Sequence, residues 1–514
     1  MISQASNPVM FDARGNAAQL NRVRRKVKGQ AKNLFRGFKG ANDQNLLDWV
    51  YQPIEINQIL RHDLQRLRAR SRDLARNDDT CRRYLALLRQ NVLGHRGIVL
   101  QAKNKLGNGS PDTARNNNIE TEWKGWGRKR RYRGQLIGPT ACAQMSYREL
   151  EWLVLHTRAV DGECFVQILR GYPHNPHRYA VRLLDADLLD GAYSTKNKDT
   201  GNRIEMGIEL DEFNRPVAYW FSNGVTATAK AARERIPADQ ILHVFRREFP
   251  GQLRGIPDCA GVMHKAKMLN GVNEAVVVGW RVAAAKMGFF VSKDDEDFAD
   301  PADDPDDDTE KRTAPESSFD ATPGSFDYVD DATDFKTFDV TYPDSTFREG
   351  HKVFMQQQAN GYNVSTPTLS NDYSDVNYSS LRQALLEDRS GWRCYQAEFT
   401  DDFSQPLFDD WYEWSTDVTG SLAPALSPPV TVAIPRGYPW VDPLKEVRAQ
   451  VEANANNLRT RQSIMADNDG GDFLETVDEL QSESEALRER GLLLLAASEG
   501  AAEQETEEED EDDA

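Results

Sequence analysis

The longest stretch of regularly spaced apolar residues lies in the middle of the chain, from Cys259 to Phe289. Its apolar side chains recur at intervals of three and four, which predicts one helix of about 30 residues, ~45 Å long. The opposite side of this helix is apolar as well, at Val278, Val282 and Ala285. A helix that is apolar on all sides must be covered by more than one neighbour. The pattern therefore predicts a long structural strut, such as the central helix of a large core.

Helical periodicity also covers much of the remaining chain. Between Pro53 and about Leu93 leucines share one helical face, and Gly94 then accepts the left-handed conformation that ends a helix. Another helix is expected to carry Trp123 and Trp126 and to end in the basic run 128–131. Further helices are expected over residues 147–158, 345–358, 379–416, 443–465 and 474–495.

Residues 163–246 follow a different pattern. Short runs rich in β-branched and aromatic residues, separated by turn residues, are typical of strands. Such runs lie at residues 98–101, 164–169, 180–184, 216–221 and 241–245. The last four form a small β-rich unit of ~80 residues, inserted between helical parts. The expected fold class is therefore α+β, mainly helical.

Composition bounds the class of protein. A chain of 514 residues suggests about three domain-sized units, and without ~18 uninterrupted apolar residues we expect no membrane span. The first residues lack the basic flank and apolar core of a secretory signal, so none is expected. The five cysteines are scattered and odd in number. We therefore expect a reduced protein made inside a cell, with neither a disulfide framework nor a zinc site.

Charge is distributed unevenly along the chain, whose formal net charge is −18. Residues 1–135 contain 28 lysines and arginines against 11 acidic residues, so this part is basic. Residues 294–340 contain 18 acidic residues against 3 basic ones, and residues 499–514 contain 10 acidic residues and no basic one. Such an uneven distribution of charge along the chain predicts at least one charged binding partner.

A search for catalytic residues gives no constellation. The sequence has no phosphate-binding loop, H-E-x-x-H, paired C-x-x-C or G-x-S-x-G, so we expect no enzyme, no cofactor and no metal site. His174 and His177 are expected to be surface residues of a Pro-rich turn. Asp185 and Asp187 have a spacing that nucleases use to hold a metal ion, but a turn at the end of a strand explains it better.

Several segments together resemble one family, the lambda-type phage portal proteins. Each is short, but they occur in the family's order across about residues 60–460. They are residues 68–77 (RARSRDLARN), 91–94 (NVLG), 207–209 (GIE), 215–219 (RPVAY), 236–238 (IPA), 242–245 (LHVF), 250–257 (PGQLRGIP), 375–382 (DVNYSSLR), 385–387 (LLE) and 440–446 (WVDPLKE). The acidic stretch 294–335 and the acidic tail are longer than is usual in the family, and no residue roles are transferred into them.

The resemblance implies a portal-type fold and a dodecameric ring at one vertex of the capsid, through which double-stranded DNA is packaged and ejected. It also implies contacts with the major capsid protein, the terminase large subunit and head–tail connector or adaptor proteins. Assembly is expected in the host cytoplasm, with the product in the virion and no membrane contact. Copies of the central helix in the ring would supply the cover that its apolar sides need.

The parts of a portal protein are then expected at these residues. They are a basic arm (1–45), the wing (46–256, with the β-rich unit at 163–246), the first stem helix (257–290), an acidic clip region (291–342), the second stem helix (343–362), the tunnel loop (363–378), a long wing helix and connector (379–439), crown helices (440–498) and an acidic tail (499–514).

Three sets of candidate residues follow from this assignment. The candidates for the wall of a DNA channel, in the tunnel loop, are Asn371, Asp372, Tyr373, Ser374 and Asp375. The stem candidates are Lys265, Lys267, Arg281 and Lys286. For the three lysines a local ring of positive charge is an open alternative, because the sequence does not decide their orientation. The candidates for docking terminase or connector proteins are Asp303, Asp304, Asp306, Asp307 and Asp308.

The charge distribution also has a physical use in a DNA conduit. Each contact between a basic side chain and a phosphate adds affinity through counterion release, so a conduit must avoid such contacts. Acidic wall residues repel phosphates within a Debye length of ~8 Å. We therefore expect a net acidic channel wall. The basic N-terminal region is expected mainly outside the lumen, either against capsid protein, scaffold or packaged DNA, or simply as a solvated surface.

Two alternative functions stay open at this point. One is a monomeric virion scaffold or adaptor protein that binds partners through its acidic segments; gel filtration or negative-stain imaging would separate it from a ring. The other is a metal-dependent nucleic-acid-processing enzyme that uses Asp185 and Asp187. Mg²⁺-dependent cleavage that is lost on Asp187→Ala would favour the enzyme.

Overall fold

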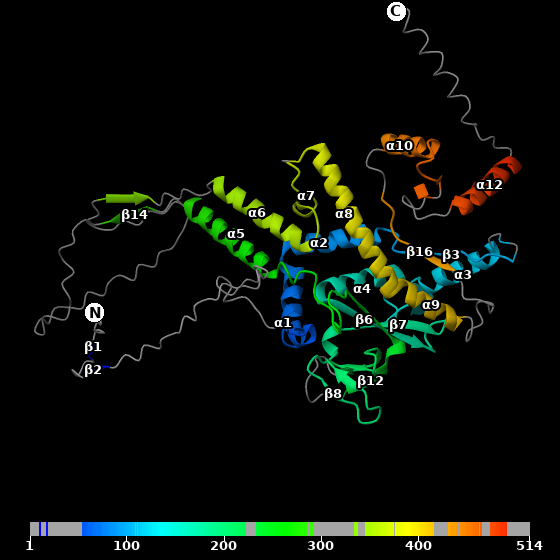
Figure 1. The fold of residues 1–514 in the computed structure, drawn as a ribbon, viewed down its shortest axis with the longest axis horizontal. Helices are drawn as coiled ribbons and strands as arrows, with labels where there is room; N and C mark the ends of the chain where they lie inside the picture. The colour runs from blue at the N-terminus through cyan, green and yellow to red at the C-terminus, as the bar shows by residue number, and fades with distance from the viewer. Residues whose placement is uncertain are drawn as a thin grey trace, which may run out of the picture. The chain divides into compact units, whose positions relative to one another are not determined.

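The structure is a computed structural model of the whole chain. It describes residues 10–11, 17–18, 54–107, 109, 112–222, 233–284, 288–291, 334–337, 345–374, 376–415, 430–438, 443–461, 463–464 and 473–490. The chain divides into two compact units, Met1–Glu55 and Ile56–Ala514. In the first unit, strands β1 (Met10–Phe11) and β2 (Ala17–Ala18) pair antiparallel, and the rest of the expected basic arm lies outside the described residues. All later elements belong to the second unit (Figure 1).

The second unit begins with the two helices that the leucine pattern predicts. Helix α1 (Ile56–Asn77) and helix α2 (Asp79–Leu88) are separated by Asp78, whose carboxylate accepts the backbone N–H three residues later at 2.7 Å and so caps α2. A π-helical turn, Arg89–Leu93, extends α2. It ends at Gly94, whose φ of 63° confirms that a glycine is needed there.

The next helical segment ends earlier than its sequence pattern predicts. Helix α3 (Thr113–Trp126) carries both tryptophans but stops before the basic run 128–131, so the expected helix end is wrong. The run enters strand β4 (Arg130–Tyr132), which pairs with β5 (Gln135–Ile137) in a hairpin, because pairing overrides the helix propensity of arginine. Helix α4 (Tyr147–Asp161) follows as predicted.

Residues 163–245 form two antiparallel sheets, which confirms the predicted β-rich segment. The first has the strand order β13-β6-β7, with β6 (Glu163–Arg170) between β7 (Tyr179–Leu184) and β13 (Ile241–Phe245). The second has the order β12-β11-β10-β9-β8. Its strands are β8 (Thr195–Lys196), β9 (Arg203–Glu205), β10 (Ile208–Leu210), β11 (Pro216–Ser222) and β12 (Arg233–Pro237).

A long helix near the C-terminal side completes the core. Helix α8 (Tyr378–Phe399) continues through a π-helical turn, Thr400–Ser404, into α9 (Gln405–Trp414), which confirms the helix predicted over 379–416. Its aromatic residues pack on those of α3, and the ring centroids of Trp123 and Trp411 are 5.1 Å apart. Rings at this spacing contribute about 0.5–1.5 kcal/mol beyond their burial.

One strand of this region has no counterpart in the sequence prediction. Strand β16 (Thr431–Ile434) pairs antiparallel with β3 (Val99–Ala102), more than 300 residues away in the chain. The predicted strand over 98–101 is confirmed by β3. Its partner was missed because a short strand is defined by its pairing more than by its own propensity.

The central strut is shorter than the apolar pattern predicts. Helix α5 (Met263–Ala284) has 22 residues, or about 33 Å. Residues 257–262 form tight turns instead, with the Val262 N–H bonded to the Cys259 carbonyl. The expected helix end at Phe289 is wrong, because strand β14 (Gly288–Val291) pairs there with β15 (Asp334–Thr337).

Helix α6 (Ser345–Tyr362) contacts α5 and runs beside it (Figure 1), as expected of a second stem helix. The short helix α7 (Thr366–Ser370) follows within the segment expected to be a loop. Toward the C-terminus, α10 (Pro443–Ala455) ends before the predicted residue 465, because Asn457 takes a left-handed φ of 56°. Helix α12 (Phe473–Glu489) agrees with the last predicted helix up to the end of the described residues.

Candidate functional site

The loop between α7 and α8 contains the residues that the sequence places on a channel wall. Asn371 ends α7 in the left-handed conformation, with φ of 61°. Asp372 then accepts hydrogen bonds from the backbone N–H and the hydroxyl of Ser374, at 3.0 and 2.7 Å. Asn371, Asp372, Tyr373 and Ser374 are all exposed, and Asp375 lies outside the described residues.

The hydrogen bonds within this loop keep its carboxylate charged. Those from the Ser374 hydroxyl and backbone N–H lower the pKa of Asp372, and the cations of Arg348 and Lys352 lower it further. Because the side chain is exposed, its negative charge faces solvent at neutral pH. The loop therefore presents the kind of charge that was expected of a channel wall.

The start of the loop segment is attached to α8 by one carboxylate, that of Asp388. Its oxygens accept hydrogen bonds from the Ser365 backbone N–H at 2.7 Å, the Ser365 hydroxyl at 2.6 Å and the Thr368 hydroxyl at 2.8 Å. Asp388 is buried, so these bonds replace the water that the carboxylate has lost. The start of the loop segment is therefore fixed to α8.

Helix α2 holds the other side of the same segment. The Arg83 guanidinium donates to the Thr368 carbonyl at 3.3 Å and to the Asn371 side-chain oxygen at 3.4 Å. The sequence analysis missed Arg83 and Asp388, since each lies in an ordinary amphipathic helix. The sequence does contain one signal for a nearby acceptor such as Asp388. It is the pair Ser365 and Thr368, whose hydroxyls need acceptors at the start of a short helix.

The stem candidates lie on α5, whose covered face is turned toward α6 and the core. Lys267 and Arg281 are exposed, Lys265 is half-buried, and Lys286 lies outside the described residues. The apolar residues of α5 divide into two groups. Buried residues are Ala266, Leu269 and Val276, whereas exposed ones are Met268, Val272, Val277, Val278 and Trp280, each between 42% and 51% accessible.

A shallow hollow of about 350 Å³ lies between α5 and α6. Its lining residues are Asn273, Val276, Val277, Trp280, Phe347, Arg348 and His351. The rings of Trp280 and Phe347 meet edge to face, with centroids 6.5 Å apart. Exposed apolar surface of this kind typically marks a protein–protein contact.

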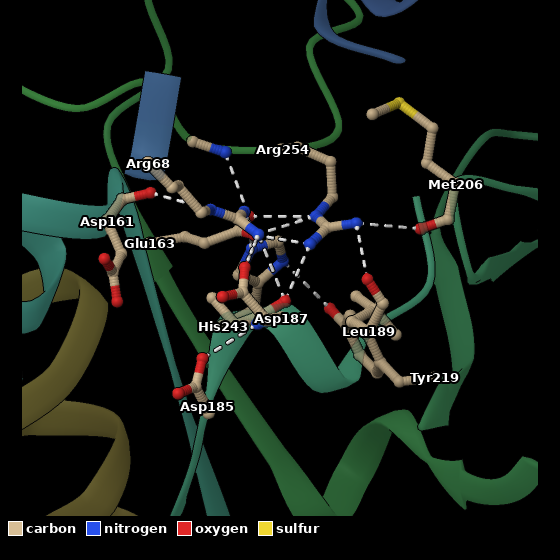
Figure 2. A network of polar contacts seen from close by, with 12 residues as sticks. Arg68, Asp161, Glu163, Asp185, Asp187, Leu189, Met206, Tyr219, His243 and Arg254 are labelled. Atoms are coloured by element: carbon tan, nitrogen blue, oxygen red, sulfur yellow. Dashed lines mark hydrogen bonds and ion pairs between the residues drawn. The ribbon is translucent and has the colours of Figure 1, made fainter. Parts of the chain in front are cut away.

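A buried polar network joins α1 to both sheets (Figure 2). At its centre the Glu163 carboxylate accepts hydrogen bonds from Arg254 at 2.6 and 2.8 Å, from Arg68, and from the Gly255 backbone N–H at 3.0 Å. His243 lies at 3.0 Å from the second carboxylate oxygen. Arg254 also donates to the carbonyl groups of Leu189 and Met206. One glutamate of β6 therefore joins α1, β13 and the chain around Arg254.

The protonation states in the network follow from its charges. Burial alone raises the pKa of Glu163, but Arg254, Arg68 and His243 outweigh burial and hold the pKa well below its ordinary value. Burial lowers the pKa of His243, against the opposing effect of Glu163, so this histidine is neutral at pH 7. A neutral ring donates from Nε2 to Glu163.

The paired aspartates lie beside this network, in the turn that ends β7. Asp185 caps a short 3₁₀ helix by accepting the Asp187 backbone N–H at 2.9 Å, which confirms the predicted strand-ending turn. Arg72 donates to Asp185 at 2.9 Å, to Asp187 at 2.6 Å and to Asp161 at 2.7 Å. A guanidinium thus occupies the position between the carboxylates where a nuclease would hold its metal ion.

The side chains described above hold one another in place through ion pairs, hydrogen bonds and apolar contacts. Among the residues that the structure describes, no group of three or more His, Cys, Asp or Glu is placed to hold a metal ion. Within the same part of the chain, no helix is long and apolar enough to span a bilayer. The candidate docking residues Asp303, Asp304, Asp306, Asp307 and Asp308 lie outside the described residues.

The comparison with protein families and the comparison with individual known proteins find the same kind of protein. The family model described as phage portal protein, lambda family, matches residues 43–396. A protein of Halomonas phage phiHAP-1, described as a probable portal protein, is 29% identical over 428 residues, covering 80% of this chain and 79% of the relative.

Solved structures with a similar chain come from gene transfer agent (GTA) particles. One is the neck of a native GTA particle computed with C12 symmetry, at 13% identity and a TM-score of 0.39, covering 79% of this chain and 92% of that one. Another is the virion of a native GTA particle, at 12% identity and a TM-score of 0.40. The match covers 81% of this chain and 94% of that one.

The matched family model defines the class of protein as a phage portal protein. The chain belongs to the lambda family of phage portal proteins, since the family model covers more than half of it. The resemblance predicted from the short segments is confirmed, and the function is that of a phage portal protein.

Proposed function

We propose that this portal protein assembles into a ring, expected to be a dodecamer, around an axial channel for double-stranded DNA. Helices α5 and α6 form the stem, residues 46–256 and 379–439 the wing, and residues 440–498 the crown. The loop at residues 371–377 faces the channel, and the segment 291–342 forms the clip. The assembled ring lies at the portal vertex of the virion and has no catalytic activity of its own.

The observation that carries this proposal is the exposed apolar surface of α5. With 3.6 residues per turn, Met268 and Val272 lie on one side of the covered stripe, and Val278 lies on the other side. A head-to-tail ring requires two different faces on each subunit, one for each neighbour. Two exposed apolar sides on one helix meet that requirement, and burial of either removes apolar area from water.

The loop supports the assignment of the channel wall. Asp372 remains charged and exposed, and the bonds to Asp388 and Arg83 keep the base of the loop in place. A wall that repels phosphates lets DNA slide instead of binding it. The acidic residues 303–308 would present a contrasting surface for terminase or for head–tail connector proteins, and the wing would contact the major capsid protein.

Negative-stain imaging of the purified chain, combined with sedimentation velocity, tests the ring. We expect annular particles of uniform size with a central hole. A species of 58.1 kDa, the mass of one chain, under all assembly conditions would contradict the proposal and favour a monomeric adaptor.

A duplex-binding titration tests the channel wall. Assembled rings are expected to bind a short duplex weakly, with little dependence of the affinity on salt. Tight binding that weakens steeply with salt would show that the lumen grips DNA, even if the ring itself is present.

A further inference from the structure

A wide groove with four arginines lies away from the stem and the loop. It has a volume of about 1360 Å³ and lies between the π-helical turn 89–93, the start of α4 and the chain after β16. We call it the arginine groove, after the four residues that line it: Arg89, Arg96, Arg148 and Arg436.

The described part of the chain does not neutralise the charge of the arginine groove. Among the described residues, none of these four guanidiniums forms an ion pair. Arg148 donates to the His95 carbonyl at 2.8 Å, and the ring of Trp152 lies 4.7 Å from the Arg89 guanidinium carbon. The carboxylate that lines the groove, Glu149, is already paired with Lys129 at 3.3 Å. Four positive charges gathered in one hollow repel each other unless an anion joins them.

The walls of the groove are partly apolar. Leu93, Val99, Trp152, Ile434 and Pro435 line it together with the arginines. A nucleic-acid backbone offers phosphates but no aliphatic side chains. A peptide that carries both acidic and aliphatic residues matches this lining in charge and in polarity.

The chain itself contains a segment of that chemistry. Residues 491–495 are a glycine followed by four leucines, and residues 499–514 contain 10 acidic residues and no basic one. We propose that the arginine groove binds this C-terminal segment, residues 491–514, with the leucines against the apolar wall and the acidic residues against the arginines. The 24 residues span at most about 80 Å when extended, and the crosslinking experiment below tells whether the segment comes from the same copy or from a neighbour.

The proposal goes beyond the portal function and does not depend on the ring. Ion pairs at a surface are weak singly and are screened by salt. Binding by this mechanism therefore needs several contacts at once and weakens as salt rises. The tail would occupy the groove at low salt and leave it when a more acidic partner competes.

Zero-length crosslinking in the full-length chain tests the occupant. Arg96→Lys keeps the charge and adds an amine that carbodiimide couples to carboxylates, and Arg131→Lys on the exposed strand β4 is the matched control. Mass spectrometry is expected to find residue 96 joined to a residue of 499–514, with at least about tenfold less product in 0.5 M NaCl. Mixing ¹⁵N-labelled and unlabelled chains tells whether the tail comes from the same copy or from a neighbour.

The results of these experiments distinguish binding of the C-terminal segment in the groove from binding of a nucleic acid there. No crosslink at residue 96, or equal yields at residues 96 and 131, overturns the proposal. In a second arm, a labelled duplex is titrated with Arg89→Glu/Arg96→Glu and with the control Arg130→Glu/Arg131→Glu. Duplex affinity reduced about tenfold by the groove variant alone, without a tail crosslink, would make the groove a phosphate site and also overturn the proposal.

Discussion

Asp388 in α8 accepts hydrogen bonds from both the backbone N–H and the hydroxyl of Ser365, at 2.7 and 2.6 Å, across 23 residues of sequence. The contact fixes the point where the chain leaves α6 and turns toward the exposed loop. Because the carboxylate is buried, it has no water to replace these donors. The position of the loop therefore depends on one side chain that lies outside it.

The first prediction concerns this carboxylate. Asp388→Asn removes one acceptor oxygen and the charge, and should lower the free energy of unfolding by about 1–2 kcal/mol. Amide hydrogen exchange across residues 365–374 should become faster. The control is Glu387→Gln, the exposed neighbour on the same helix, which should change neither quantity. Unchanged exchange in Asp388→Asn would show that Arg83 alone holds the loop.

A second prediction concerns the centre of the buried network. Glu163→Gln leaves Arg68 and Arg254 buried without their counter-charge, which should cost about 3–5 kcal/mol of unfolding free energy in urea denaturation. Glu234→Gln, at an exposed position of β12, is the matched control. A loss below about 1 kcal/mol would mean that the two arginines are not held by this carboxylate.

The third prediction is a pH dependence at Glu151. Burial raises the pKa of this side chain to about 8, against opposing hydrogen bonds from Tyr147 and the Ile98 backbone. Its pKa in the unfolded chain is about 4.3, so the folded state binds the proton more tightly. The resulting stability is complete below pH ~4.3 and is lost as the pH rises toward the folded value.

Comparison with Glu151→Gln isolates this effect, because the amide does not titrate. Between pH 5 and pH 7 the unfolding free energy of the natural chain should fall by about 2–3 kcal/mol relative to that of the variant. Parallel pH profiles of the two chains would show that Glu151 is ionised in the folded state.

A fourth prediction concerns ring assembly. Val272→Asp places a charge on the exposed apolar side of α5, where a neighbouring subunit is proposed to bury it. Folding of the single chain should be unaffected, since Val272 is 42% accessible, whereas sedimentation velocity should show rings replaced by smaller species. Phe213→Asp in the exposed turn between β10 and β11 should leave assembly intact. Rings formed equally by both variants would remove α5 from the interface.

The elements that local patterns specify were predictable from the sequence. Helices α1 and α2, the glycine that ends their extension at Gly94, and the strands β6 and β13 all followed from spacing and residue type. These patterns express burial of one face, which is visible in a linear sequence.

The elements that distant partners specify were not predictable in the same way. Strand β16 exists because β3 offers it an edge, and β14 ends the central helix because it pairs with β15. Within the candidate site, the sequence predicts a loop over residues 363–378, part of which forms the short helix α7, and Asp388 and Arg83 have no local signal. Glu163 looks like the polar first residue of a strand, and only the fold reveals that it is wholly buried.

The π-helical turn at residues 400–404 absorbs one extra residue without changing the register of the helix that follows it. Such a turn contains one residue more than an α-helical turn would, and each residue rotates an α-helix by about 100°. Phe408 and Trp411, both fully buried, lie downstream of it. Deleting a single residue from the turn would convert it to an ordinary α-helical turn and leave both rings facing the core, so relatives of this chain are expected to tolerate the loss of one residue at this point but not elsewhere in the helix.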